Sequence, residues 1–272
     1  MTLPEHAVVV ALLTPYRSDG SVDPDALARH VDQLVEAGVD GLMPAGTTGE
    51  GALLDEDEVL AVVEATLRAA AGAAPVLAHV GRPATAATVR LLRRAVEAGA
   101  DMVSAVVPYY YGLDDRQVVA HYEVLLDAAG STPLFAYTIP DRARNELSAA
   151  AVRELAAAGL AGVKDSTKSL ERHREYLACG VPVLMGSDGL VFEALELGAA
   201  GCISAIANLR PDLLLELARA SREGRPEDAE RLQGAVSELR VELAREPALV
   251  ALKRAVAARV PGYAPEVRRP LG

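Results

Sequence analysis

The chain has 272 residues, a length that suits one barrel-sized domain better than a small module or two separate cores. Hydrophobic residues make up 51% and charged residues 24%, as in ordinary globular proteins. The formal net charge of −11 argues against a nucleic-acid partner, which requires clustered basic residues. An acidic protein can still bind an anionic substrate where a helix N-terminus or a single arginine creates a local positive potential.

The cysteines and the apolar runs indicate where the protein resides. Cys179 and Cys202 have the spacing of neither a metal site nor a disulfide framework, so we expect both to be small buried residues. No apolar run reaches the roughly 18–20 residues of a membrane span. The first run, residues 8–13, follows Glu5 and lacks the basic flank and length of a signal peptide. We therefore expect a cytoplasmic protein with no membrane partner.

A repeated unit organises the chain: a helical segment rich in small residues ends at a glycine, and a short apolar run follows. Glycine is the common residue just past a helix end. The apolar runs do not alternate with polar residues, which is typical of strands covered on both faces. The glycines are Gly38, Gly72, Gly99, Gly130, Gly159, Gly180, Gly198 and Gly224. The runs are 8–13, 41–45, 75–80, 102–107, 133–137, 161–164, 182–185 and 201–206.

Eight strand–helix units in a chain of this length favour a closed parallel (β/α)₈ TIM barrel over an open sheet. Asp23 followed by Pro24 predicts a helix start, and Asp55 with Glu58 has the spacing of a capping box. Residues 225 to about 258 read as two further helices with no strand between them. We therefore assign residues 1–224 to the barrel and 225–272 to a C-terminal helical extension of the same domain.

Polar residues gather at the C-terminal ends of the predicted strands, where the active sites of such barrels lie. They come from several separate strands, so the fold would bring them to one opening. They are residues 46–50, 109–111, Tyr137, Lys164, residues 186–189 and Ser204.

Lys164 is the most informative of these residues. The chain has three lysines, Lys164, Lys168 and Lys253, and 24 arginines. Because lysine is rare in this chain, a lysine at a strand end suggests a chemical role. An amine at an apolar strand end loses solvation, which favours its neutral, nucleophilic form, whereas arginine stays protonated. The alternative is a lysine whose side chain extends out of the barrel into solvent.

The other motifs also allow two interpretations. Gly46-Thr47-Thr48-Gly49-Glu50 is a small-residue turn whose amides and hydroxyls could face a carboxylate, or a plain connection. Residues 109–111 are three tyrosines that could form a subunit contact, and Tyr137 could be a core residue with a satisfied hydroxyl. Together these residues supply a nucleophile, a phenol that can carry protons and an anion-holding turn.

Metal and nucleotide cofactors are not expected. The five histidines form no pair at ligand spacing, and only His79 lies at a strand end. A glycine-rich loop of the dinucleotide-binding type is also missing from the sequence.

Four stretches resemble the dihydrodipicolinate synthase and N-acetylneuraminate lyase family, in the family's order and at matching spacing from about residue 7 to 220. They are residues 46–50, 137–140, 162–166 and 201–204. The resemblance implies a class I pyruvate-dependent lyase on a TIM barrel. Such an enzyme needs no cofactor or metal, because the substrate is bound covalently as a Schiff base. The family's members are often homotetramers, so we expect a homotetramer or a homodimer.

The resemblance also assigns catalytic roles. Lys164 would form the imine with the keto carbon of pyruvate. Tyr137 would shuttle protons during imine formation and carbon–carbon bond making. Thr48 would link Tyr137 to Tyr110, which in many members reaches in from a neighbouring subunit.

The substrate-binding residues follow in the same way. Thr47 and Thr48 would hold the pyruvate carboxylate, and Arg142 matches the position that binds the carboxylate of the aldehyde in the synthases. The alternative for Arg142 is an ion pair with Asp141 or Glu146 on a solvated loop. Completing the predicted site are Gly186, Asp188 and Ile203.

The second substrate is less well defined by the sequence. Arg142 and residues 201–208 favour condensation of pyruvate with aspartate semialdehyde. Residues 79–81 and 103–106 are closer to the 2-keto-3-deoxy sugar-acid aldolases and dehydratases. Gly189 stands where the neuraminate lyases have a glutamate, which argues against sialic acid. Other classes are a metal-dependent or phosphate-recognising barrel enzyme, which lacks its ligand cluster here, and an inactive barrel with a binding or regulatory role.

Overall fold

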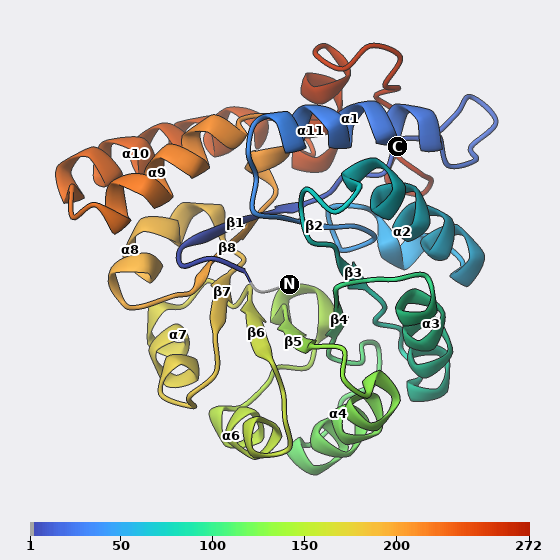
Figure 1. The fold of residues 1–272 in the computed structure, drawn as a ribbon, viewed down its shortest axis with the longest axis vertical. Coiled ribbons are helices and arrows are strands. Elements are labelled where there is room, and N and C mark those ends of the chain that lie inside the picture. Colours follow the sequence, from blue (N-terminus) through green and yellow to red (C-terminus); the bar gives the residue numbers. More distant parts are fainter. Residues whose placement is uncertain (1–2) are drawn as a thin grey trace.

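The computed structural model describes residues 3–272 and contains eight parallel strands ringed by helices (Figure 1). The strand order is β2-β1-β8-β7-β6-β5-β4-β3, and a bridge between Leu42 and Val76 closes the ring between β2 and β3. The predicted TIM barrel is therefore confirmed. The strands are β1 (Ala7–Ala11), β2 (Gly41–Met43), β3 (Leu77–His79), β4 (Met102–Val106), β5 (Leu134–Thr138), β6 (Gly162–Asp165), β7 (Val183–Met185) and β8 (Gly201–Ser204).

At least one helix follows each strand, and these helices cover the outside of the barrel (Figure 1). The barrel helices are α1 (Pro24–Glu36), α2 (Glu56–Ala70), α3 (Thr85–Glu97), α4 (Asp115–Ala129), α5 (Pro140–Ala143), α6 (Ala149–Ala157), α7 (Leu170–Leu177), α8 (Val191–Glu196) and α9 (Pro211–Arg222). Two more, α10 (Pro226–Leu243) and α11 (Ala248–Ala257), follow as predicted, without a strand between them.

The local signals in the sequence are found at the helix ends. All eight repeat glycines have positive φ, the backbone conformation that ends a helix at low cost when the residue has no Cβ. The Asp23 side chain caps α1, with Pro24 in the first turn, and Asp55 and Glu58 form a complete capping box on α2. These contacts fix where α1 and α2 begin, and so they set the lengths of the loops that join these helices to the preceding strands.

The strands are buried on both faces, as their apolar sequences predicted. Alternate residues of a strand point to opposite faces, so β6 directs Lys164 into the barrel and the next residue, Asp165, towards the helices. There Asp165 accepts a hydrogen bond from His173 Nδ1 of α7 at 2.8 Å. Both cysteines are buried and unpaired. Within residues 3–272, no helix is long and apolar enough to cross a membrane.

A buried ion pair ties the C-terminal helices to the turn after β2. The Nζ of Lys253, on α11, donates to Glu50 Oε1 at 2.6 Å, and both side chains are fully buried. The backbone amide of Arg268 donates to the other oxygen of Glu50 at 2.7 Å. Residues from the end of the described chain thus hold the conformation of the 46–50 turn.

We expect the substitution Lys253→Met to destabilise the protein by about 3–5 kcal/mol, because it leaves the Glu50 carboxylate buried without its cation. Urea unfolding measures the loss. The neighbouring Arg254→Met is the control, since Arg254 is exposed and pairs with Glu246 at the surface. Equal stabilities of the two variants would show that the buried pair is unimportant.

Candidate active site

Nearly all of the predicted site residues line one cavity of about 340 Å³ at the C-terminal end of the barrel. Lys164, Tyr137 and Arg142 face it together with the turn after β2. Of the predicted residues, Tyr110 alone is not part of this cavity. The members that do line it are Thr47, Thr48, Tyr137, Arg142, Lys164, Gly186, Asp188 and Ile203.

Lys164 lies at the centre of this cavity and is only 4% exposed. Its Nζ is 4.0 Å from the centroid of the Tyr137 ring and 3.6 Å from Met43 Sδ. No ion pair to Lys164 is formed by residues 3–272, whereas Lys168 and Lys253 each pair with a carboxylate. An amine buried between an aromatic face and a thioether is well placed to act as a nucleophile.

Tyr137 comes from β5, the neighbour of β6, and its hydroxyl shares a hydrogen bond of 3.1 Å with Thr47 Oγ1. The resemblance assigns this contact to Thr48, whereas in the structure Thr47 makes it. The chain leaves β2 through a left-handed residue, Ala45, so successive turn residues point in different directions. Thr48 lines the cavity but does not reach the phenol.

The 46–50 turn is fixed from several sides. A Cβ at Gly51 would come within 1.8 Å of the Ala45 carbonyl oxygen, so only glycine fits there. The hydroxyl of Thr14 donates to the Gly49 carbonyl at 2.7 Å, and Arg82 Nη1 donates to that of Gly51 at 2.7 Å. A turn held in this way can present its threonine hydroxyls to a ligand with little reorganisation.

The three consecutive tyrosines take separate positions. Tyr109 lines a second cavity beside the first, whereas Tyr110 and Tyr111 are 75% and 72% exposed on the loop after β4. Their rings meet edge to face, and Tyr110 has a φ of 85°, which is unusual for a residue with a side chain. Tyr110 thus points away from the site of its own chain.

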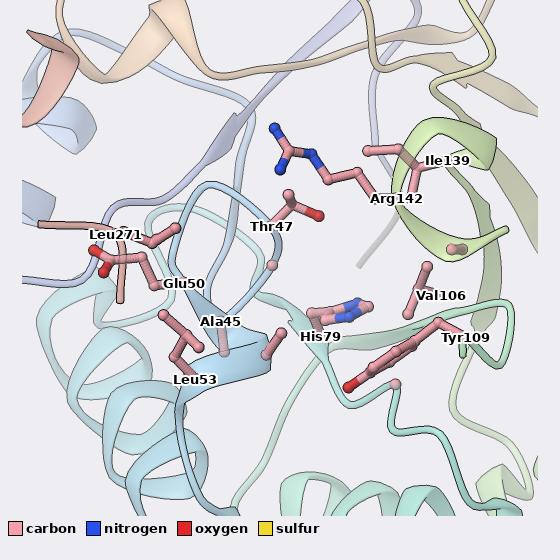
Figure 2. Close-up of a pocket in the computed structure, with 14 residues that line it drawn as sticks. Ala45, Thr47, Glu50, Leu53, His79, Val106, Tyr109, Ile139, Arg142 and Leu271 are labelled. Atoms are coloured by element: carbon pink, nitrogen blue, oxygen red, sulfur yellow. The ribbon is translucent and has the colours of Figure 1, made fainter. Parts of the chain in front are cut away.

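The second cavity, of about 250 Å³, shares Thr47, Ile139 and Arg142 with the first. Figure 2 shows Arg142 reaching from α5 towards Thr47, with His79 and Tyr109 on the opposite wall. The His79 ring meets the Tyr137 ring edge to face at 5.7 Å. Burial, together with the charges of Lys164 and Arg82, lowers the pKa of His79 to about 3. His79 is therefore a neutral hydrogen-bonding group in the site.

Arg142 does not form the ion pairs that we considered as its alternative. Asp141 pairs with Lys168, and Glu146 pairs with Arg172. Arg142 forms no ion pair with any residue in the range 3–272, and it lines both cavities. Its guanidinium is free to bind an anion.

Gly186 and Asp188, which were predicted, and Arg240, which was not, also line this cavity. A Cβ on Gly186 would come within 2.1 Å of Ser166 Oγ and 3.3 Å of Lys164 Cε, so the glycine leaves room for both. Burial raises the pKa of Asp188, whose Oδ2 accepts a hydrogen bond from the Ile206 amide at 3.3 Å. Arg240, from α10, lines the Lys164 cavity on its outer side. Nothing in the sequence near the strand ends indicated Arg240.

A metal centre is not apparent: residues 3–272 contain no group of three or more His, Cys, Asp or Glu side chains placed to hold an ion.

Comparison with known proteins places the chain among related barrels. Residues 5–272 match the model of the dihydrodipicolinate synthetase family. An uncharacterised DapA-like lyase of Halobacterium salinarum is 39% identical over 93% of this chain and 84% of its own length. A 4-hydroxy-tetrahydrodipicolinate synthase of Acidiphilium cryptum is 39% identical over 80% of this chain and 76% of its own. Among solved structures, the E. coli K12 prophage protein YagE in complex with pyruvate has a TM-score of 0.93 at 27% identity, covering 97% of this chain and 92% of that one.

The burial of His79 predicts a pH dependence of stability. The pKa of His79 falls from 6.5 in the unfolded chain to about 3, so its contribution is complete above pH 6.5 and is lost as the pH decreases towards 3. The free energy of unfolding should fall by about 1.4 kcal/mol per pH unit in that range on account of this group. Urea unfolding between pH 7 and 5 tests it: His79→Gln should show a correspondingly smaller slope, and identical slopes would contradict the prediction.

Proposed function

The chain belongs to the dihydrodipicolinate synthetase family and is a lyase, and we propose that it joins pyruvate to aspartate semialdehyde through a Schiff base on Lys164. The observation that carries the proposal is the position of Lys164, buried at the end of β6 with its Nζ over the ring of Tyr137. The relative from Acidiphilium cryptum is named a 4-hydroxy-tetrahydrodipicolinate synthase, and the solved structure of the E. coli protein YagE is a complex with pyruvate.

In the first half-reaction the neutral amine of Lys164 attacks the keto carbon of pyruvate. A carbon–nitrogen bond forms, the carbonyl oxygen is protonated twice, and it leaves as water. The hydroxyl of Tyr137, hydrogen-bonded to Thr47, supplies and removes these protons. The pyruvate carboxylate is held by the hydroxyls and amides of the 46–50 turn.

In the second half-reaction the imine loses a proton from the pyruvate methyl group and becomes an enamine. The methyl-derived carbon attacks the aldehyde carbon, a carbon–carbon bond forms, and the aldehyde oxygen takes a proton. The amino group of the bound adduct then attacks the imine carbon and displaces Lys164, which closes a ring and restores the free amine. Arg142 holds the carboxylate of the aldehyde as a charge-assisted contact.

A second candidate is a 2-keto-3-deoxy sugar-acid aldolase or dehydratase. His79 favours it, because a neutral imidazole beside Tyr137 can hydrogen-bond to a substrate hydroxyl. The first half-reaction on Lys164 is common to both candidates, and the aldehyde distinguishes them.

We also propose that the enzyme is a homo-oligomer in which Tyr110 reaches a second copy. Two adjacent tyrosine rings, 75% and 72% exposed, form a large aromatic surface at the end of the β4 loop. Such rings are enriched at protein interfaces.

Treatment with borohydride in the presence of pyruvate should reduce the imine and add a stable mass to the peptide that contains Lys164. Peptide mass spectrometry locates the label. Lys168 and Lys253 serve as internal controls, because each is held in an ion pair. Labelling of either one instead, or none at all, would overturn the assignment of Lys164.

Thr47→Val should lower kcat about fivefold, because the Tyr137 hydroxyl loses the hydrogen bond that positions it, a contact worth roughly 1 kcal/mol. Thr48→Val is the matched control and should leave kcat close to that of the wild type. Steady-state kinetics with saturating pyruvate compares them. The reverse order of effects would restore the role that the sequence suggested for Thr48.

Arg142→Ala should raise KM for aspartate semialdehyde and reduce kcat/KM roughly 10–150-fold, the range for loss of a contact worth about 1.5–3 kcal/mol. Imine formation with pyruvate, followed by borohydride trapping, should be nearly unchanged. If the variant keeps its kinetics, or if turnover is efficient only with uncharged polyhydroxy aldehydes, the sugar-acid aldolase is the better assignment.

A further inference from the structure

A second guanidinium, that of Arg240, faces the opening of the barrel from the C-terminal helix α10. Arg240 and Arg142 together line two cavities that meet at this opening, the one that holds Lys164 and a larger one bounded by α10 and α11. The two arginines are about a hundred residues apart in the sequence, and the fold brings them to the same cavities.

Gly189 makes the position of Arg240 possible. A Cβ on residue 189 would lie 2.1 Å from Arg240 Nη1, so any larger residue would displace the guanidinium. Gly189 follows Asp188, which lines the same cavity and lies close enough to Arg240 for the positive charge to act on its carboxyl group. The glycine thus leaves a space in the wall, and the guanidinium occupies it.

Among residues 3–272, the Arg240 guanidinium has no ion-pair partner. Nearby charged side chains are engaged elsewhere: Lys168 pairs with Asp141, and Glu146 pairs with Arg172. The guanidinium of Arg240 forms no ion pair or hydrogen bond with another group of the chain between residues 3 and 272, although the protein carries a net charge of −11. Two unpaired guanidinium groups at one opening create a local positive potential in an acidic protein.

We propose that Arg240 is a specificity-determining residue that binds, with Arg142, the terminal carboxylate of the carbonyl acceptor. The inference rests on the proposed Schiff-base function and adds to it a second residue, from the C-terminal helix α10, that selects aldehydes with an acid group. Two planar guanidinium groups suit a carboxylate, which offers four lone pairs to several N–H donors. The wall beside them is apolar, with Leu243, Leu249 and Leu252, and it offers little to a chain of hydroxyl groups.

The experiment compares acceptors that differ only in the acid group. Succinic semialdehyde and butanal have the same number of carbons, with a carboxylate in one and a methyl group in the other. Aspartate semialdehyde and tartronate semialdehyde then separate an amino-acid source from a sugar-acid source of the carboxylate, and glyceraldehyde is the uncharged counterpart of tartronate semialdehyde. Condensation with pyruvate is followed by mass spectrometry of the product for wild type, Arg240→Gln and Arg240→Lys.

Arg245→Gln is the matched control. It removes the same charge just beyond the end of α10, but Arg245 faces an outer groove beside Arg210 and Leu213 rather than the barrel opening. Borohydride trapping of pyruvate on Lys164 is repeated for every variant, so that loss of the proposed function is seen separately from loss of acceptor selectivity.

Arg240→Gln should reduce kcat/KM for succinic semialdehyde about tenfold, the size expected for a lost charge-assisted contact, and should change that for butanal little. Arg240→Lys should recover part of the loss, and added salt should weaken the wild-type preference for the acid. Equal losses for both aldehydes, or the same loss in Arg245→Gln, would overturn the role of Arg240. Failure to trap pyruvate in the wild type would instead overturn the proposed function itself.

Discussion

The pairing register of β5 and β6 is the constraint on which the site depends. Tyr137 pairs with Lys164, so the phenol and the amine point into the barrel side by side. A slip of one residue would turn Lys164 towards the helices and bring Asp165, which now binds His173, into the barrel. The packing of both strands prevents that slip, because it would exchange the side chains that face the barrel interior with those that face the helices. The chemistry that we propose for Lys164 is therefore a consequence of how the barrel packs.

The C-terminal helices complete the site that the barrel begins. Lys253 of α11 reaches Glu50 and fixes the turn that carries Thr47 and Thr48. Arg240 of α10 covers the opening over Gly189. The Lys253–Glu50 contact holds the turn whose Thr47 meets Tyr137, and Arg240 places a positive charge at the barrel opening. The extension thus contributes to stability and to the electrostatics of the cavity at once.

The sequence predicted what depends on local patterns. Apolar runs, helix-ending glycines and the Asp55–Glu58 capping box predicted the barrel, and a lysine at a strand end marked the position that we propose to be reactive. Two features depended on geometry that no local pattern encodes. Thr47 and Thr48 are equivalent as letters, and the backbone of an irregular turn decides which of them meets Tyr137. Arg240 is one of many arginines on polar helix faces, and only the packing of α10 over Gly189 distinguishes it.

The most direct test of this account is a crystal structure of the protein soaked with pyruvate. The account predicts continuous electron density from Lys164 Nζ to the keto carbon, with the carboxylate at the 46–50 turn and the Tyr137 hydroxyl still bonded to Thr47. Pyruvate bound without a covalent link, or attached to another lysine, would contradict it.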